Sequence, residues 1–493
     1  MPKTTEIKIS NFSGGISDDV RKQSGSEFII SKHFDIFSNP KRLTPYRSLE
    51  QDDTDVTTYF VRDFKYASAS TKLYGLGQTG AGLTKIVYKA DATANGWTVP
   101  ASSEGNGAVK NGCFVEFKDY MWGFQGTNQL FKWGLLSGTP AITNSVATVG
   151  QTITSVADGV INSLGELYIA YNNVVLRIAA DGTTVTDSAK TVPTNYKITS
   201  LANWGNYLAI GCSPKDSFNG VSKVFIWNYS SELFQETIDW GEGDLRVLET
   251  VEGYLVGITD RYLNNATGAG RGSMIIQIYS GGVPQVVKEI FTQALTGKTI
   301  PTSKALRNNR LFWSAKIMTN SAGTEYNEGI WSFGRKNVNY PFTVTLDIID
   351  ENVDTDGIQG FGVAANYFFI AHSNDGSIDK TNDAATYAFT SIYESLVQNF
   401  GDSDTDKVIE AVKVSFRRLV SGETLTVKIK VDDAASWTTV GTYSTVGGTS
   451  ETFLNIATGD AFPSGKEIKL RLESVGGLEI TEWYMRATIT NTL

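Results

Sequence analysis

Gly205-Asn-Tyr-Leu-Ala-Ile210 is one copy of a short phrase that recurs along much of the chain and decides its fold. Each copy has a turn followed by an apolar, aromatic-rich run that suits a β-strand. The other copies are Lys72-Leu-Tyr-Gly-Leu-Gly77, Asp119-Tyr-Met-Trp-Gly-Phe124, Gly165-Glu-Leu-Tyr-Ile-Ala170, Gly253-Tyr-Leu-Val-Gly-Ile258, Asn309-Arg-Leu-Phe-Trp-Ser314 and Asn366-Tyr-Phe-Phe-Ile-Ala371. Their spacing is roughly 40 to 57 residues, a period typical of solenoids, propellers and arrays.

Each copy is followed by at least one further strand pattern. After the copy at 165–170, for example, Val174-Val-Leu-Arg-Ile178 leads into an Asp181-Gly182 hairpin turn. Such a small sheet cannot bury both faces alone, but radial stacking lets each sheet cover its neighbour. We therefore expect an all-β chain with a β-propeller of about seven blades over residues 56–398, with six or eight blades as alternatives. A solenoid fits less well, because insertions such as 319–327 make the repeats irregular.

The last region, residues 399–493, changes character. After a polar link, stretches such as Thr424-Leu-Thr-Val-Lys-Ile-Lys430 alternate apolar with polar residues. This pattern predicts strands with one buried and one solvated face. We expect a C-terminal β-sandwich, jelly-roll-like or immunoglobulin-like.

Residues 1–55 lack the pattern of a compact domain. Gly14-Gly15 marks a turn, an apolar strand follows, and Asn39-Pro-Lys-Arg-Leu-Thr-Pro-Tyr-Arg47 closes the segment. An extended N-terminal arm that lies over a neighbouring surface has this form. We expect deletion of residues 1–47 to leave a folded propeller and to abolish assembly.

The phrase Phe12-Ser-Gly-Gly-Ile-Ser17, with the apolar strand and the basic, proline-containing element after it, resembles the N-terminus of the tail nozzle (tail tubular) proteins of short-tailed phages. The resemblance covers residues 11–47, which is less than a tenth of the chain. The chain as a whole is much shorter than those nozzle proteins. It implies that the arm is the assembly site, through Phe12, Gly14, Gly15, Ile16, Phe34, Arg42 and Arg47.

The same resemblance implies a structural component of a bacteriophage tail: a nozzle, ring or tail-tip subunit. Such a subunit would assemble with its own copies as a homo-oligomeric ring, and with neighbouring tail or portal-adaptor proteins. Together they would form or close the DNA conduit. The protein would be made in the host cytoplasm and would end in the virion tail.

The charge of the chain suits that role. With 43 Lys and Arg against 52 Asp and Glu, the formal net charge is −9. This excludes a basic face over the whole protein, and an acidic lumen would let genome DNA pass without specific binding, since binding comes from Lys and Arg that neutralise phosphates. No signal-like segment or membrane-spanning apolar run occurs in the sequence, so no membrane partner is expected.

The sequence offers little for catalysis or cofactors. The two histidines, His33 and His372, give no triad or zinc pattern, and Cys113 and Cys212 read as buried free thiols. Gly75-Leu-Gly-Gln-Thr-Gly80 has dinucleotide-loop spacing, but a strand pattern follows where a helix is needed. Gly297-Lys-Thr299 ends like a P-loop that lacks its first glycine. We expect no cofactor, no metal and no enzyme activity.

Two other functions stay open. A receptor- or glycan-binding tail-tip protein could stack sugars on sandwich aromatics, for which Trp437 and Trp483 are candidates, although core packing is the simpler role for both. A propeller glycoside hydrolase would need paired carboxylates. Acidic candidates are Asp239, Glu242, Asp244, Asp350, Glu351, Asp354 and Asp356. Asp402, Asp404 and Asp406 have calcium-loop spacing, but Lys407 replaces the required glycine.

Overall fold

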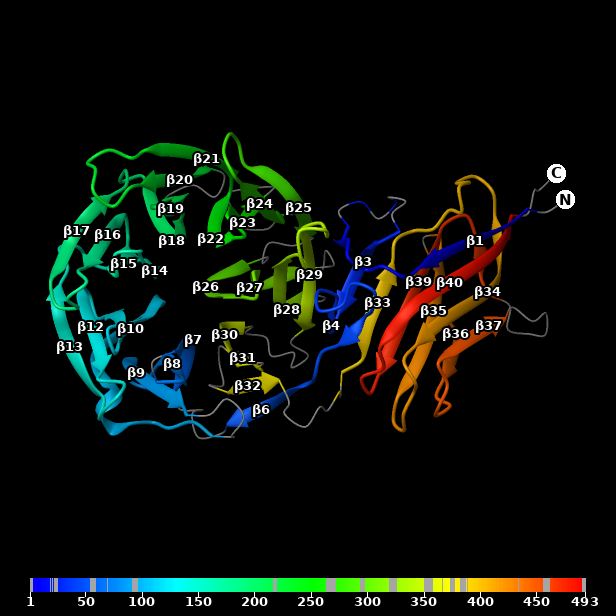
Figure 1. Cartoon of the computed structure of the whole chain (residues 1–493), viewed down its shortest axis with the longest axis horizontal. Coiled ribbons are helices and arrows are strands. Elements are labelled where there is room, and N and C mark those ends of the chain that lie inside the picture. The colour runs from blue at the N-terminus through cyan, green and yellow to red at the C-terminus, as the bar shows by residue number, and fades with distance from the viewer. Residues whose placement is uncertain are drawn as a thin grey trace. The chain divides into compact units, whose positions relative to one another are not determined.

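The computed structural model, shown in Figure 1, consists almost wholly of β-strands and confirms the all-β expectation. It describes residues 3–17, 19, 21, 25–53, 59–68, 70–90, 96–215, 220–262, 272–292, 298–318, 326–349, 358–365, 367–372, 377–381, 387, 389–432, 434–454 and 462–489. In this part of the chain the only helix is the short η1 (Ala101–Ser103). No helix in the same residues is long and apolar enough to cross a membrane.

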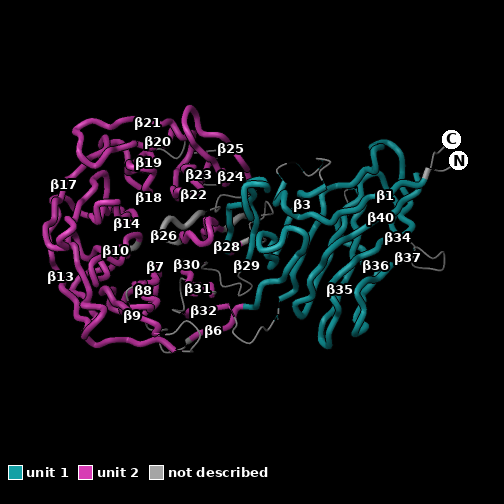
Figure 2. The backbone as a smooth tube through the Cα atoms, viewed as in Figure 1, with its two compact units in different colours: residues 1–48, 330–349, 382–493 teal, residues 49–329, 350–381 magenta. Residues whose placement is uncertain are grey.

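The chain folds into two compact units, coloured separately in Figure 2. Unit 1 comprises residues 1–48, 330–349 and 382–493, and unit 2 comprises residues 49–329 and 350–381. The sequence boundaries at 55 and 398 are therefore corrected, because both the first and the last third of the chain contribute to unit 1.

Unit 2 carries the expected β-propeller except for residues 330–349 of the sixth blade, which the division assigns to unit 1. Figure 1 shows the sheets of the propeller arranged around a common centre. Blade 1 contains β7 (Phe60–Ala67), β8 (Lys72–Gln78), β9 (Leu83–Lys89) and the start of β10 (Glu104–Phe117). Blade 2 contains the rest of β10 with β11 (Tyr120–Gln125), β12 (Gln129–Gly134) and β13 (Ala141–Thr148). Strand β10 thus joins the first two blades into one 7-stranded sheet.

The next four blades are separate 4-stranded antiparallel sheets. Blades 3 and 4 consist of β14 (Val156–Ile161), β15 (Leu167–Tyr171), β16 (Val174–Ile178), β17 (Val185–Thr191), β18 (Tyr196–Trp204), β19 (Tyr207–Pro214), β20 (Val221–Trp227) and β21 (Glu236–Glu242). Blades 5 and 6 consist of β22 (Asp244–Val251), β23 (Tyr254–Tyr262), β24 (Gly272–Tyr279), β25 (Gln285–Thr292), β26 (Lys298–Arg307), β27 (Arg310–Met318), β28 (Tyr326–Gly334) and β29 (Thr343–Ile349).

Blade 7 is completed from the N-terminal part of the chain. It contains β30 (Ile358–Ala364), β31 (Tyr367–His372), β32 (Ile378–Thr381) and β6 (Leu49–Asp53). Strand β6 pairs antiparallel with β32 and so closes the propeller. Seven blades can be traced in the described residues, as predicted, but the arm was wrongly extended over 49–53, which belong to the propeller.

The recurring phrase is the second strand of each blade. Its copies coincide with β8, β11, β15, β19, β23, β27 and β31. These strands lie between two neighbours in the sheet and are buried on both faces, as in β15, where all residues are buried. This explains why the phrase is continuously apolar, whereas the outermost strands alternate with polar residues.

The core of the propeller lies between neighbouring blades. Phe124 of blade 2 packs edge-on against Tyr171 of blade 3, with ring centroids 5.7 Å apart. Blade 7 packs on blade 1 in the same way, where Trp97 meets Phe369 at 6.2 Å. The ring of sheets is therefore closed by hydrophobic contacts as well as by β6.

Unit 1 contains the expected β-sandwich, with its two sheets drawn in Figure 1. One sheet has the order β1-β40-β34-β37, with β38 added to β34, and the other has the order β2-β3-β33-β39-β35-β36. The strands are β1 (Lys3–Ile9), β2 (Gly15–Ile16), β3 (Glu27–Lys32), β33 (Ser391–Ser395), β34 (Lys407–Phe416), β35 (Thr424–Val431), β36 (Thr438–Tyr443), β37 (Ser450–Leu454), β38 (Ser464–Gly465), β39 (Ile468–Val475) and β40 (Ile480–Ile489). A small pair, β4 (Phe34–Asp35) and β5 (Thr44–Pro45), also belongs to the unit.

The predicted arm is part of this sandwich, which corrects the prediction of a separate segment. Strand β1 pairs with β40 over its whole length, from Lys3 opposite Ile489 to Ile9 opposite Trp483. Strand β3 pairs with β33, and β2 pairs with β3. The N-terminal segment lies against its own chain because the edges of β40 and β33 offer main-chain partners there.

Candidate functional site

The innermost strands of the propeller share an irregularity. Each of β7, β10, β14, β18, β22, β26 and β30 shifts register against its neighbour within the described residues. Such bulges bend a strand and change the direction of the side chains beside them. The shifts in blades 1, 2, 3, 4 and 6 occur at or next to residues whose side chains belong to one group in the middle of the propeller.

We call this group the axial cluster. Its members come from the innermost strands of six successive blades, and all but Glu249 lie at a register shift. The members are Asp63, Cys113, Asp158, Ser200, Glu249 and Lys304. The bulges thus bring together residues that are up to 241 positions apart in the sequence numbering from Asp63 to Lys304.

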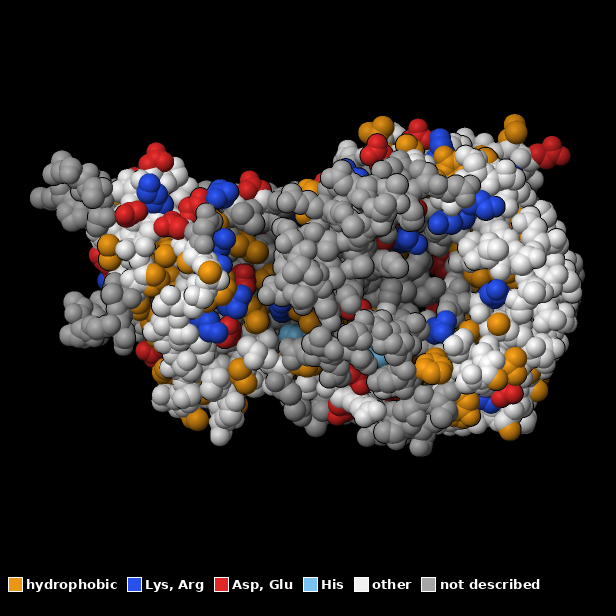
Figure 3. Space-filling model, turned by 180° about the vertical axis from the view of Figure 1, so that it is seen from behind, with side chains coloured by type: hydrophobic (Ala, Val, Ile, Leu, Met, Phe, Trp, Pro, Cys, Tyr) orange, Lys and Arg blue, Asp and Glu red, His pale blue; other side chains and the backbone are white. Residues whose placement is uncertain are grey.

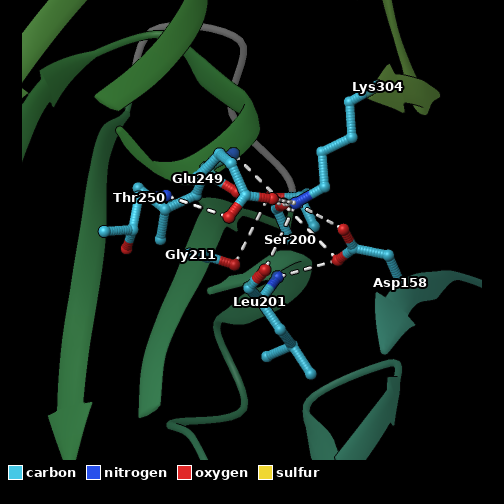
Figure 4. A network of polar contacts seen from close by, with 9 residues as sticks. Asp158, Ser200, Leu201, Gly211, Glu249, Thr250 and Lys304 are labelled. Atoms are coloured by element: carbon cyan, nitrogen blue, oxygen red, sulfur yellow. Dashed lines mark hydrogen bonds and ion pairs between the residues drawn. The ribbon is translucent and has the colours of Figure 1, made fainter. Parts of the chain in front are cut away.

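Lys304 contacts three other members of the cluster, Asp158, Ser200 and Glu249, as Figure 4 shows. Its Nζ is 2.5 Å from Asp158 Oδ2 and 3.2 Å from Glu249 Oε2. The same ammonium donates to the Leu248 carbonyl at 2.7 Å and to Ser200 Oγ at 3.2 Å. One side chain of blade 6 therefore links blades 3, 4 and 5.

The carboxylates around Lys304 are themselves oriented by the backbone. Asp158 Oδ1 accepts from the Leu201 N–H at 2.9 Å, and Glu249 Oε1 accepts from the Thr250 N–H at 3.0 Å. Ser200 Oγ accepts from the Leu248 N–H at 3.1 Å. The ammonium is thus surrounded by acceptors that are already fixed, a preorganised ionic contact.

Protonation in the cluster follows from burial and charge. Burial opposes the charge of Lys304, but Asp158 and Glu249 outweigh it and raise the pKa of the lysine. Burial raises the pKa of Asp158, while Lys304 opposes that rise. Burial likewise raises the pKa of the Cys113 thiol. Lys304 stays protonated and Cys113 stays a thiol, so neither group is an activated nucleophile.

Asp63 makes the stability of the propeller depend on pH. Burial raises its pKa from 3.8 to about 8, against the opposing charge of Lys65. Between these two values the folded state binds more protons than the unfolded state, so stability falls as the pH rises, with a limiting slope of about 1.4 kcal/mol per pH unit. Urea unfolding at several pH values should show a smaller decrease for Asp63→Asn than for the wild type. Equal pH dependence of both proteins would contradict this assignment.

A second buried ionic group holds the closing strand. Asp52 of β6 lies 2.9 Å from Lys89 Nζ and 3.5 Å from Lys380 Nζ, and the three side chains are 0%, 1% and 0% exposed. The Trp97 indole N–H donates to the other carboxylate oxygen at 2.8 Å. Asp52 therefore ties β6 to β9 and β32 with charge-assisted hydrogen bonds.

Most of the predicted assembly residues are buried within unit 1. Phe12 and Phe34 are fully buried and Ile16 nearly so. Phe12 packs edge-on against Tyr393 with centroids 5.4 Å apart. Buried side chains of this kind hold their own unit together, so a contact between these residues and a neighbouring protein is not available in this conformation.

The remaining predicted residues are two glycines and two arginines. Gly15 has φ +70°, and a Cβ there would lie 1.6 Å from Thr343 Oγ1. A Cβ at Gly14 would lie 2.6 Å from Glu27 Cγ and 2.7 Å from Ser26 Oγ. Arg42 is exposed and pairs with Glu479 at 3.0 Å, while Arg47 is half-buried. The phrase is therefore explained by packing inside the chain, and its role in assembly stays a prediction.

The histidines and cysteines have local roles. His372 is buried with its Nε2 3.2 Å from Asp379 Oδ2, and His33 stacks on Phe389 at 4.4 Å. Cys113 and Cys212 are buried free thiols, as predicted. The glycine phrase at 75–80 lies in the β8–β9 hairpin, which confirms the strand expected after it.

Two of the acidic candidates, Asp239 and Asp244, are paired with cations. Asp239 accepts from Lys223 at 2.6 Å, and Asp244 accepts from Arg246 at 2.8 Å. The acids at 350, 351, 354 and 356 and the start of the P-loop-like stretch lie outside the described residues. In the possible calcium loop, the Lys407 ammonium donates to the Asp402 carbonyl. Within the described part, no three His, Cys, Asp or Glu side chains group as a metal site.

The two tryptophans of the sandwich differ. Trp483 is fully buried and donates to the Tyr393 hydroxyl at 3.3 Å, so the proposed sugar stacking on Trp483 is wrong. Trp437 is half-buried, with the Arg471 guanidinium 4.4 Å from its ring centroid. A sugar could reach only what the arginine leaves uncovered.

The sequence reasoning missed Lys304, Asp158 and Asp52. A usable signal was present at Asp158, because a charge next to Gly159 inside an otherwise apolar strand indicates a bulge. Lys304 gave no such signal, since a lysine in a strand usually faces solvent.

No protein-family profile and no curated protein matches this chain. Among solved structures, the chain is similar to virginiamycin B lyase from Staphylococcus aureus, with 10% identity, a TM-score of 0.43 and coverage of 68% of this chain and 98% of that one. It is also similar to the Pan2 WD40 domain of Neurospora crassa, with 10% identity, a TM-score of 0.40 and coverage of 68% and 95%. For the Dos1 propeller the values are 12%, 0.42, 68% and 94%. These likenesses concern the propeller fold alone.

Proposed function

We propose that this propeller protein is a structural subunit of a bacteriophage tail. It would assemble with its own copies and with neighbouring tail proteins to form or close the conduit for DNA. The observation that carries the proposal is the course of the chain through its two units. The chain changes unit at 48/49, 329/330, 349/350 and 381/382, so neither unit is one continuous segment.

Interlaced connectivity suits a part that must withstand force. Unfolding of one unit disturbs segments that continue directly into the other, so partial opening carries a larger cost than in two units joined by one linker. Resistance to forced unfolding depends on how slowly a protein unfolds. A chain whose two units exchange segments in this way would unfold slowly. A tail subunit would bear such forces when the genome passes through the conduit.

The N-terminal phrase supports the same proposal in a corrected form. The residues that resemble the nozzle proteins are those that fix β2 and β3 in the sandwich, so the resemblance concerns a structural element of the fold. Contacts with other subunits would then be made by exposed strands. The net charge of −9 remains compatible with a conduit along which DNA slides.

Immunogold labelling tests the proposal. Antibodies raised against the purified chain would be applied to phage particles from a culture that produces it, with pre-immune serum as the control. We expect gold particles at the tail. Particles without label, together with chain found only free in the lysate, would contradict a role in the tail.

A further inference from the structure

A small pocket opens in unit 1 beside the turn that joins β28 to β29. Its volume is about 180 Å³ with the open mouth included. Sites for drug-sized ligands usually have about 300–1,000 Å³, so this pocket admits only a small chemical group. Two distant parts of the chain line it: residues 13, 36, 37 and 40 of the N-terminal segment, and residues 335, 336, 340, 341 and 343.

One wall of the pocket carries a buried hydroxyl group. Thr343 lines the pocket and is 2% exposed, and its Oγ1 has no hydrogen-bond partner among the described residues. A buried hydroxyl of this kind is costly unless an ion, a ligand or water satisfies it. Its position depends on Gly15, since a Cβ there would lie 1.6 Å from this oxygen. Ser13 of the same N-terminal phrase also lines the pocket.

Two positive side chains lie at the pocket. The Arg335 guanidinium is 4.3 Å from the centroid of the Phe342 ring, and Lys336 Nζ donates to the Ser38 carbonyl at 2.7 Å. An ammonium has three donor hydrogens, so Lys336 keeps donors for a ligand. No carboxylate is among the lining residues of the described chain, and nearby Asp35 is hydrogen-bonded to Ser38. The pocket therefore favours an anion.

A phosphate group fits these donors better than a carboxylate does. It carries a charge of about −1.5 to −2 near pH 7 and has three strong acceptor oxygens. These match two cations together with the hydroxyl groups of Ser13 and Thr343, whereas a carboxylate has one charge and two oxygens. Arginine, lysine, serine and threonine are side chains that commonly bind phosphate.

The surface argues against a nucleic-acid backbone as the source of the phosphate. Binding of DNA requires several Lys and Arg side chains that neutralise successive phosphates. On the face drawn in Figure 3, the coloured Lys and Arg side chains lie singly or in small groups among acidic and uncharged ones, without a continuous basic stripe. The net charge of −9 agrees with this. A free phosphate ion or a phosphate monoester is therefore the better candidate.

We propose that this pocket of unit 1 binds a phosphate group. The hydroxyl groups of Ser13 and Thr343 donate to its oxygens, and Arg335 and Lys336 neutralise its charge. The bound group joins the N-terminal segment to the β28–β29 turn and thereby stabilises the folded unit by mass action. The site does not depend on the proposed tail function, so either can be refuted without the other.

Isothermal titration calorimetry of the full chain with sodium phosphate, at fixed ionic strength, tests the site. We expect one site with a dissociation constant of about 1 mM or lower. Lys336→Gln should weaken binding about tenfold or more, because it removes a charge-assisted hydrogen bond. Lys41→Gln is the matched control, since it removes the same charge from an exposed side chain that does not line the pocket.

Thr343→Val separates ligand binding from packing. Valine has nearly the same shape without the hydroxyl, so the variant should be as stable as the wild type in phosphate-free buffer. Its melting temperature should rise less with added phosphate than that of the wild type. Thr345→Val removes another buried hydroxyl without a described partner from the same strand but outside the pocket, so it should respond like the wild type.

Absence of phosphate binding to the wild type at millimolar concentrations would overturn the proposal, as would normal binding by Lys336→Gln and Thr343→Val. Acetate that binds as tightly as phosphate would refute the preference for phosphate. Displacement of phosphate by a short oligonucleotide without terminal phosphates would assign the pocket to nucleic acid instead. Titration with O-phosphoserine distinguishes the two sources that support the site: tighter binding than inorganic phosphate indicates a monoester, and weaker binding indicates the free ion.

Discussion

Replacement of Asp52 by alanine should destabilise the propeller by about 3–5 kcal/mol, the usual cost of removing one partner from a buried ion pair. The carboxylate is fully buried and is shared by Lys89 and Lys380. Its loss would leave two buried ammonium groups without this counter-charge and would remove the hydrogen bond from Trp97. Chemical denaturation monitored by tryptophan fluorescence measures the change.

Glu50→Ala is the matched control for this experiment. Glu50 lies on the same strand, is 33% exposed and is 3.9 Å from Lys380. An ion pair of that exposure contributes about 0–1 kcal/mol, so the control should unfold close to the wild type. Equal effects of Asp52→Ala and Glu50→Ala would contradict the role of Asp52 in closing the propeller.

Gly15→Ala should destabilise unit 1 by about 3 kcal/mol or more. A left-handed conformation costs a residue with a Cβ about 1–2 kcal/mol. Here the new Cβ would also lie 1.6 Å from Thr343 Oγ1 and 2.7 Å from the Val344 carbonyl oxygen. The second atom is backbone, so β2 or β29 would have to move. Thermal unfolding and the yield of folded protein measure the effect.

Gly205→Ala separates the two causes. Gly205 has φ +59°, and a Cβ there would meet no atom within 4 Å. This variant should lose only the conformational part, about 1–2 kcal/mol. If Gly15→Ala were no worse than Gly205→Ala, the close packing of the N-terminal phrase against β29 would be refuted.

The propeller could be predicted from sequence because its signal is local and repeated. The second strand of every blade is buried on both faces, so its sequence is continuously apolar, as at 205–210 and 253–258. The hairpins beside it use turn residues such as Asp181 and Gly182. The number of copies then gives the number of blades without knowledge of any distant contact.

The closing strand could not be predicted in the same way. Leu49-Glu-Gln-Asp-Asp53 contains a single apolar residue, and its partner β32 follows more than 300 positions later. The pairing of β1 with β40 spans nearly the whole chain. Pairing between distant strands produces no periodic pattern in the sequence of either strand. A segment whose partner strand is unknown is therefore predicted as an extended arm. For this reason, deletion of residues 1–47 would spare β6 but remove three strands from the sandwich.

The axial cluster was hidden for a related reason. Its residues are single positions at bulges in different blades, and only the closed ring brings them together. The phrase at 12–16 was recognised by its residues, but its packing could not be predicted, because burial of Phe12 against Tyr393 depends on a residue nearly 400 positions away. Sequence identified which residues mattered at that site, and the structure identified what they contact.

Hydrogen–deuterium exchange of the isolated chain tests most directly that the N-terminal segment is built into both units. Peptides covering β1, β3 and β6 would be compared with peptides covering their partners β40, β33 and β32 at a concentration low enough to keep the protein dissociated. We predict that each N-terminal peptide exchanges as slowly as its partner strand. Rapid exchange across residues 1–53 beside protected partners would show a free arm and would contradict the account.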